Sequence, residues 1–330
     1  VRKHFFKRSK IGQYSTMSDL PKTLYVILNH NVKSITTVYY EELKYYQEQD
    51  NFKLLLVDNG SKVEKRSHHT THFFKKNMYF NGAIQWAFKQ MIDNPEYEYL
   101  VFSNNDVIIH GYKFVRTMIE SMEEGNFTMM SPSLLEQSAG QNFWPIMHCW
   151  YKKEPRVVPW IDFTCPFIHR RLIDEIKQFP SYWKSPSYGF DDYCSIVCNR
   201  EGWKVGVNDL VSIFHVGQMT YREEYGVLAD DGLDFYTMQN KHRENFDWNF
   251  EKSGLRKEQK ELDIKKALYG RNNSLKMGRL PATPDEGYYK QFAPAVERQW
   301  FRNEEQKIIY AKRQDRLEQD YIKRKKRERN

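Results

Sequence analysis

Three short apolar runs, each followed directly by polar residues, constrain the fold of this chain more than any other feature. The runs are LYVIL at 24–28, LLLV at 54–57 and YLVF at 99–102. Helix-like segments at about 34–48 and 81–92 separate them. Strands that alternate with helices predict an α/β unit with a parallel sheet, and strands that are apolar throughout are typical of a sheet covered on both faces.

Each apolar run ends in a cluster of polar side chains. The clusters are Asn29–Asn31, Asp58–Ser61 and Ser103–Asp106. In open α/β sheets, ligands bind outside the carboxyl ends of the strands. The sequence therefore predicts a ligand site where these three clusters meet.

The second half of the chain is less regular. Residues 161–179 are typical of a strand that turns into a helix, and residues 187–205 of a polar turn, a helix and a strand. A last strand is expected to end at His215. From about residue 230 the chain is polar and helical in pattern.

Charge is concentrated at the two ends of the 330-residue chain. The net charge is +8, and residues 1–22 and residues 301–330 each carry a net +5, so the middle is close to neutral. This distribution predicts a compact domain with cationic arms that bind a polyanion, either nucleic acid or an anionic membrane face. Solvated tails that aid solubility are the alternative.

Membrane and secretory classes are not expected. No apolar run approaches the roughly 18 residues of a membrane span, and the basic start lacks the apolar segment of a signal peptide. Four cysteines are too few for a disulfide framework in a chain of this length. We predict reduced thiols and a cytoplasmic protein, in the host cytoplasm if the protein is viral. The cysteines are Cys149, Cys165, Cys194 and Cys198.

The turn Asn104-Asn105-Asp106 directly follows the third apolar run. A carboxylate there could hold a divalent cation, because Mg²⁺ and Mn²⁺ take oxygen ligands and stay open to a substrate's phosphates. Asp58 stands after the second run, where it could accept a hydrogen bond from a base imide or a ribose hydroxyl. Because Asn and Asp also dominate ordinary turns, an Asx turn remains the alternative for both.

Three further sets of residues could carry chemistry. Asp191 and Asp192 open a helix-like segment, where they could supply a general base or could cap the helix. His215 could bind a metal or a phosphate, or could be a structural histidine. The histidines of the segment 68–72 could chelate a metal, although a polar loop is the interpretation we favour.

The order and spacing of these motifs resemble the inverting glycosyltransferases of the GT-A fold, family 2 in particular, over residues 23–254. LYVILNHN resembles the family's first strand and loop, and LLLVDNGS its second strand. NMYFNGAIQWAF resembles the Asn-x-Gly-Phe segment, with Tyr79 where glycine is usual. LVFSNNDVII matches the Asn-x-Asp variant of the Asp-x-Asp motif, and GFDDYCSIVCNREGWKV resembles the Glu-Asp motif.

The resemblance implies a role for each candidate residue. It implies Mn²⁺ or Mg²⁺ held by Asp106 and His215, with Asp192 as the catalytic base and Asp191 as the acid that precedes it. The residues expected to line the nucleotide-sugar site are Asn29, Asn31, Asp58, Asn81, Asn104 and Asn105.

The fold class expected is α/β of the GT-A type, a Rossmann-like, mostly parallel sheet with flanking helices, plus a helical, basic C-terminal extension. The expected division is a basic arm at 1–22, the glycosyltransferase domain at 23–254 and a charged helical extension at 255–330.

The function expected is a metal-dependent, inverting transfer of a sugar from a nucleoside-diphosphate sugar, with uridine as the expected nucleotide, to a hydroxyl of a large acceptor. For the acceptor we favour nucleic acid, such as hydroxylated DNA bases modified by phage-like enzymes, over a membrane-linked glycan. The alternative function is a non-catalytic nucleic-acid-binding protein that acts through its basic ends.

Overall fold

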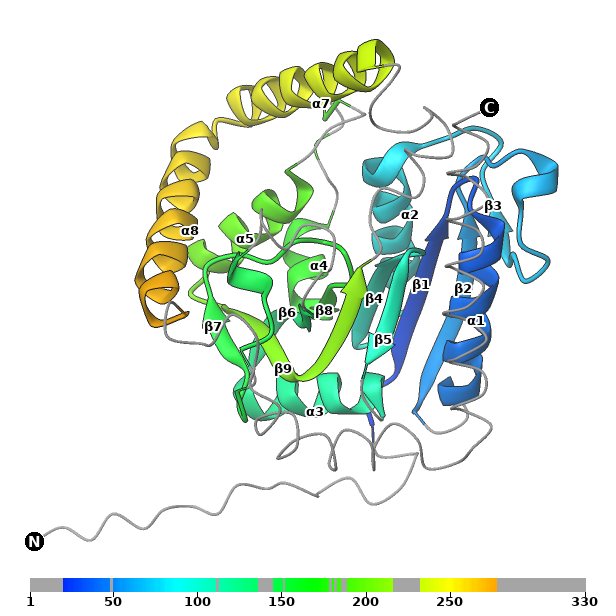
Figure 1. Cartoon of the computed structure of the whole chain (residues 1–330), viewed down its shortest axis with the longest axis horizontal. Coiled ribbons are helices and arrows are strands. Elements are labelled where there is room, and N and C mark those ends of the chain that lie inside the picture. Colours follow the sequence, from blue (N-terminus) through cyan, green and yellow to red (C-terminus); the bar gives the residue numbers. More distant parts are fainter. Residues whose placement is uncertain are drawn as a thin grey trace, which may run out of the picture.

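The computed structural model describes residues 20–47, 50–110, 113–135, 145–150, 152–177, 180, 183–184, 189–215 and 232–277. One nine-stranded sheet forms the centre, with the strand order β3-β2-β1-β4-β8-β6-β9-β5 and with β7 paired to β9 (Figure 1). The strands are β1 (Thr23–Asn29), β2 (Phe52–Asp58), β3 (His72–Phe73), β4 (Tyr99–Asn104), β5 (Val107–His110), β6 (Phe127–Leu134), β7 (Arg156–Val158), β8 (Phe167–His169) and β9 (Lys204–His215).

Helices flank the sheet, so the predicted α/β class is confirmed. The helices are α1 (Lys33–Gln47), α2 (Tyr79–Asp93), α3 (Phe114–Gly125), α4 (Arg170–Ile176), α5 (Phe190–Arg200), α7 (Gly232–Ser253) and α8 (Arg256–Met277), with short 3₁₀ turns η2 (Val63–Lys65) and η3 (Pro145–Met147).

The half of the sheet built from β3, β2, β1 and β4 is parallel, as predicted. The chain moves from β1 outward to β2 through α1, and then back past β1 to β4 through α2. Because such crossovers are right-handed, the two helices cover opposite faces of the sheet. The strand order therefore reverses between β1 and β4, the position at which α/β sheets form their ligand crevice.

The other half of the sheet is mixed, and the sequence predicted it less well. Strands β6 and β7 were not anticipated, and residues 204–215 form one continuous strand where two separate ones were expected. Strand β6 is buried along its whole length and contains Pro132. Proline disfavours a central strand because it cannot donate a ladder hydrogen bond, and here the pairing with β9 shifts register directly after Pro132.

The C-terminal helices pack against the start of α5. Gly189 has a positive φ of 95°, and a Cβ atom there would stand 2.5 Å from Phe246 and 2.7 Å from Phe250 of α7. Only glycine therefore allows α7 to approach this closely. Helix α8 lies beside α5 (Figure 1). It also contacts η3, and its Leu262 is buried.

The described part of the predicted 255–330 extension thus packs against the rest of the fold. Residues 1–19 of the predicted basic arm 1–22 and residues 278–330 of the predicted extension, which include the basic stretch 301–330, lie outside the described residues.

Two further findings concern the whole described chain. No described helix combines the length and the apolar character that a membrane span requires. The four cysteines form no disulfide, in agreement with the prediction of reduced thiols. Burial raises the pKa of Cys198 to about 12, so this thiol stays protonated at neutral pH.

Candidate functional site

The polar clusters predicted from the sequence do meet at one edge of the sheet. In the register of the parallel strands, Asn29 lies opposite Asp58, and Leu28 lies opposite Asn104. The ends of β1, β2 and β4 are therefore side by side at the point where the strand order reverses. This is the position expected for a ligand site.

Asn29 connects the three strand ends through its side-chain amide. Its Nδ2 donates to Asp58 Oδ2 at 2.8 Å, and its Oδ1 accepts from Asn105 Nδ2 at 3.1 Å and from Thr36 Oγ1 at 2.8 Å. Asn29 is fully buried, and Asn105 also donates to Thr36 at 2.7 Å. These two predicted donor-site residues hold the strand ends in position, and their contact with a nucleotide stays a prediction.

Asp58 is fully buried, and both of its carboxylate oxygens accept hydrogen bonds from the protein. Oδ1 accepts from the backbone N–H of Ser61 at 2.9 Å and from Arg66 Nε at 3.3 Å. The guanidinium of Arg66 in turn lies 4.7 Å from the ring centroid of Phe73. A contact between Asp58 and a nucleobase would have to share or exchange one of these hydrogen bonds. No sequence motif pointed to Arg66.

Three residues near these strand ends have positive φ values. Gly60 has a φ of 73°, and a Cβ there would stand 2.3 Å from the backbone of Lys76. Asn31 and Tyr79 also have positive φ values, 58° and 54°. At Tyr79 the resembled family usually has glycine, which adopts positive φ without steric cost. Here Tyr79 adopts a positive φ, although a side chain makes that conformation more costly than it is for glycine.

The other predicted donor-site residues lie along the same edge. Asn31 is buried and its Oδ1 accepts from the backbone N–H of Lys62 at 3.0 Å. Asn81 is fully buried in the first turn of α2. Asn104 is the partly exposed member of the set.

Asp106 and His215 come together although they are far apart in the sequence. The antiparallel pairing of β5 with β9 sets Val107 opposite His215. Asp106 Oδ1 consequently lies 3.3 Å from His215 Nε2, and both side chains are mostly buried. One carboxylate and one imidazole at this separation can share a divalent cation. This mixed oxygen and nitrogen donor set fits Mn²⁺, because carboxylates suit Mg²⁺ and Mn²⁺ while imidazole suits the transition metals.

Asp191 and Asp192 occupy the first turn of α5, but in different environments. The residue at the N-cap position is Gly189, so neither carboxylate is the capping residue. Asp192 is buried and accepts a hydrogen bond from the ammonium of Lys266 on α8. Asp191 stays partly exposed.

The two carboxyl groups also differ in the charged groups that lie near them. Desolvation raises the pKa of Asp191 well above its usual range, and the neighbouring carboxylates of Asp192 and Asp162 raise it further. Desolvation raises the pKa of Asp192 as well, but the ammonium of Lys266 opposes that shift.

The segment that contains Asp162 and Thr164 connects Asp191 and Asp192, the acid pair, to the end of β4. The backbone N–H of Asn104 donates to the carbonyl of Thr164 at 3.0 Å. Asp162, two residues earlier, is near enough to Asp191 to raise its pKa. Neither Asp162 nor Lys266 was predicted from the sequence as a site residue. No local motif marks either residue, because each meets the acid pair only through packing.

Comparisons with known proteins place few constraints on this site. No protein-family model matches the chain, and no curated protein sequence matches it. Among solved structures, protein A197 from STIV is 12% identical with a TM-score of 0.37, and the match covers 59% of this chain and 85% of that one.

Two solved transferases are also similar in part. The mannosyltransferase PcManGT from Pyrobaculum calidifontis, in complex with GDP-Man and Mn²⁺, is 12% identical with a TM-score of 0.40 over 59% of this chain and 58% of that one. GalNAc-T7 with UDP, GalNAc and Mn²⁺ is 13% identical with a TM-score of 0.44 over 71% of this chain and 56% of that one. This chain thus matches little more than half of either protein. Similarity at this level establishes no activity, because one fold hosts many functions.

Proposed function

We propose that this protein is a metal-dependent glycosyltransferase that transfers a sugar from a nucleoside-diphosphate sugar with inversion. The observation that carries the proposal is the convergence of Asp106 and His215, 3.3 Å apart, at the carboxyl edge of the sheet. The acid pair Asp191 and Asp192 is joined to the same edge through the segment that holds Asp162. A cation site and a general base are the two elements that such a displacement needs.

In this mechanism Asp106 and His215 are the groups that would hold the cation. A bound Mn²⁺ supplies Lewis-acid stabilisation of the negative charge that develops on the departing diphosphate. Asn29 and Asn105 keep the ends of β1 and β4 in fixed register beside this pair. Such rigid support favours catalysis, because a preorganised site needs little rearrangement during the reaction.

For the general base we assign Asp191 in place of Asp192. A base must be able to accept the hydroxyl proton, and within the described residues Asp191 forms no ion pair, whereas Asp192 is buried and paired with Lys266. Asp191 takes the hydroxyl proton as the acceptor oxygen forms a bond to the anomeric carbon. The bond from that carbon to the diphosphate oxygen breaks in the same step, so the configuration inverts and the diphosphate leaves with its electron pair.

The cation site is tested by Asp106→Ala and His215→Ala. Each variant should lower Mn²⁺-dependent release of the nucleoside diphosphate by roughly 10²-fold or more, because it removes one of only two protein ligands that we assign to the metal. A screen of UDP-, GDP- and other nucleotide sugars, read as nucleotide release, supplies the assay and identifies the donor.

His110→Gln, on the strand that follows Asp106, is the matched control and should retain most of the activity. Full activity in Asp106→Ala would refute the cation site. Absence of nucleotide release with every donor would favour the rival function, a non-catalytic nucleic-acid-binding protein.

We further propose that the acceptor is a polyanion, with nucleic acid favoured over a membrane-linked glycan. The support is the net +5 charge carried by residues 1–22 and again by residues 301–330. Basic arms of this kind should give binding that weakens steeply as salt rises. Gel shifts with duplex DNA should show binding at low salt that is lost when residues 301–330 are deleted.

Flotation with liposomes that contain phosphatidylserine is the competing measurement. Binding to liposomes and not to DNA would replace nucleic acid by a membrane-linked glycan. Binding to neither at low salt would overturn the polyanionic acceptor altogether.

A further inference from the structure

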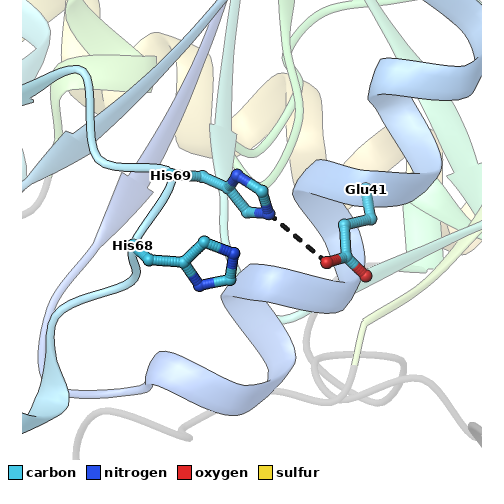
Figure 2. Close-up of side chains that lie close together, drawn as sticks. All are labelled: Glu41, His68 and His69. Carbon is cyan, nitrogen blue, oxygen red and sulfur yellow. Dashed lines mark hydrogen bonds and ion pairs between the residues drawn. The ribbon is translucent and has the colours of Figure 1, made fainter.

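Outside the candidate site, three metal-ligating side chains gather on the surface of the described chain. They are Glu41 on α1 and His68 and His69 in the loop between η2 and β3 (Figure 2). Their ligand atoms all lie within 4.8 Å of one another, and His69 Nε2 lies 3.3 Å from Glu41 Oε1. Figure 2 shows both imidazole rings on the side of the loop that faces Glu41.

We propose that Glu41, His68 and His69 form a binding site for Zn²⁺ or a similar transition-metal ion. Ligands of tetrahedral Zn²⁺, at about 2.0–2.2 Å from the ion, stand roughly 3.4 Å apart. The pair His69 and Glu41 already has this separation. The side chains of Glu41 and His68 are exposed and can rotate to close the remaining distance.

The loop is fixed to α1 by other contacts, so the ligands are held near one another without a metal. Ser67 is buried, and its Oγ lies 3.0 Å from Thr37 Oγ1 of α1 and accepts from the backbone N–H of His69 at 3.3 Å. The ring of Tyr40 stacks on His69, with centroids 4.5 Å apart and an angle of 17° between the planes. These contacts set the orientation of His69 toward α1, as neighbouring groups do for the ligands of known metal sites.

The donor chemistry selects the class of ion. Two imidazoles and one carboxylate suit Zn²⁺, Ni²⁺ and Cu²⁺, whereas Mg²⁺ and Ca²⁺ prefer a full set of oxygen ligands. Three protein ligands leave a fourth tetrahedral position for water. His72 does not join the set, because its ring stacks on Trp86 with the centroids 4.6 Å apart.

A bound ion would tie the loop to α1 next to the candidate site. The same loop carries Arg66, whose Nε donates to the buried carboxylate of Asp58 at 3.3 Å. Metal binding at the three ligands would therefore restrict the segment that positions Arg66. The site itself does not depend on the transferase activity proposed above.

The test is equilibrium dialysis of the full chain, free of any histidine tag, with Zn²⁺, together with the visible spectrum of the Co²⁺ form. Both use an Asp106→Asn background, so that the other proposed site does not contribute. We expect one equivalent of Zn²⁺ and the intense visible bands of tetrahedral Co²⁺. Glu41→Gln and His68→Gln should each weaken Zn²⁺ binding by roughly tenfold or more.

Glu64→Gln is the matched control, because Glu64 is an exposed carboxylate in η2, which directly precedes the loop, and lies outside the cluster. It should bind Zn²⁺ as the parent does. Equal binding by the parent, Glu41→Gln and His68→Gln would overturn the proposal, and so would the absence of Zn²⁺ binding by the parent. These side chains are exposed, so their substitution leaves the fold intact.

Discussion

Asp191→Asn is expected to lower the rate of sugar transfer by roughly 10²–10⁴-fold, the range that a general base contributes. The substitution removes a proton acceptor and keeps the shape of the side chain. Donor binding, measured as the dissociation constant of the nucleoside diphosphate, should stay nearly unchanged. The decisive comparison is with Asp192→Asn, which removes the neighbouring carboxylate of the same turn.

The two variants should also differ in the size of their effect on stability. Asp191→Asn should raise the free energy of unfolding at neutral pH, because it removes a desolvated charge that faces Asp192 and Asp162. Asp192→Asn should raise it by less, because the ammonium of Lys266 offsets part of the desolvation cost of the Asp192 carboxylate and keeps only Asp263 as an ion partner in the variant. Urea denaturation measures both. If Asp192→Asn abolishes transfer and Asp191→Asn does not, the roles are as the family resemblance implies.

The raised pKa of Asp191 also fixes the sign of two pH effects. The folded state holds the Asp191 proton more tightly than the unfolded state does, so this group lowers stability progressively as the pH rises from its unfolded pKa to its folded pKa. Activity should change in the opposite sense, because a base must be deprotonated. The acidic limb of the rate profile should therefore lie above the ordinary aspartate pKa of about 3.9.

Asp209→Asn is expected to destabilise the fold by about 3–5 kcal/mol, the cost of leaving one charge of a buried ion pair without its partner. The carboxylate of Asp209 is buried, and it accepts from Arg156 Nε and Nη2, both at 3.1 Å. It also accepts from the backbone N–H groups of Trp150 and Lys152, both at 3.2 Å. The substitution removes the charge that holds these four donors.

Urea denaturation of Asp209→Asn and of Glu201→Gln provides the comparison. Glu201 forms an ion pair with Arg200 at 2.9 Å, but both side chains are substantially exposed, so its loss should change stability by less than about 1 kcal/mol. Equal effects of the two substitutions would show that the buried pair contributes no more than a surface pair does.

Local patterns were sufficient to predict the half of the fold that carries the strand ends. Continuous apolar runs followed by Asn, Asp and Gly are properties of adjacent residues, and they located β1, β2 and β4 to within a few residues. The helical segments at α1 and α2 were predicted for the same reason. Strand β6 was not predicted. It contains Pro132, and its sequence does not alternate between polar and apolar residues, so only its pairing with the neighbouring strand identifies it as a strand.

The candidate site, too, could be predicted from the sequence only in part. Asp106, His215 and the acid pair could be selected because each follows a recognisable local element. Their environments could not be read from the sequence. The partner of Asp192 is Lys266 on a helix that the sequence assigned to a separate extension. Besides desolvation and Asp192, the group that raises the pKa of Asp191 is Asp162, which lies before β8 in a segment predicted as part of a strand.

The alternation of strands and helices, and the polar residues that end each strand, follow from short-range sequence, because periodicity and turn chemistry act over a few residues. The proximity of Asp106 to His215 depends on the pairing of β5 with β9, and the contrast between Asp191 and Asp192 depends on how α8 packs against α5. Burial and charge pairing are properties of the assembled chain, so only the tertiary structure decided that Asp192, and not Asp191, is paired with Lys266.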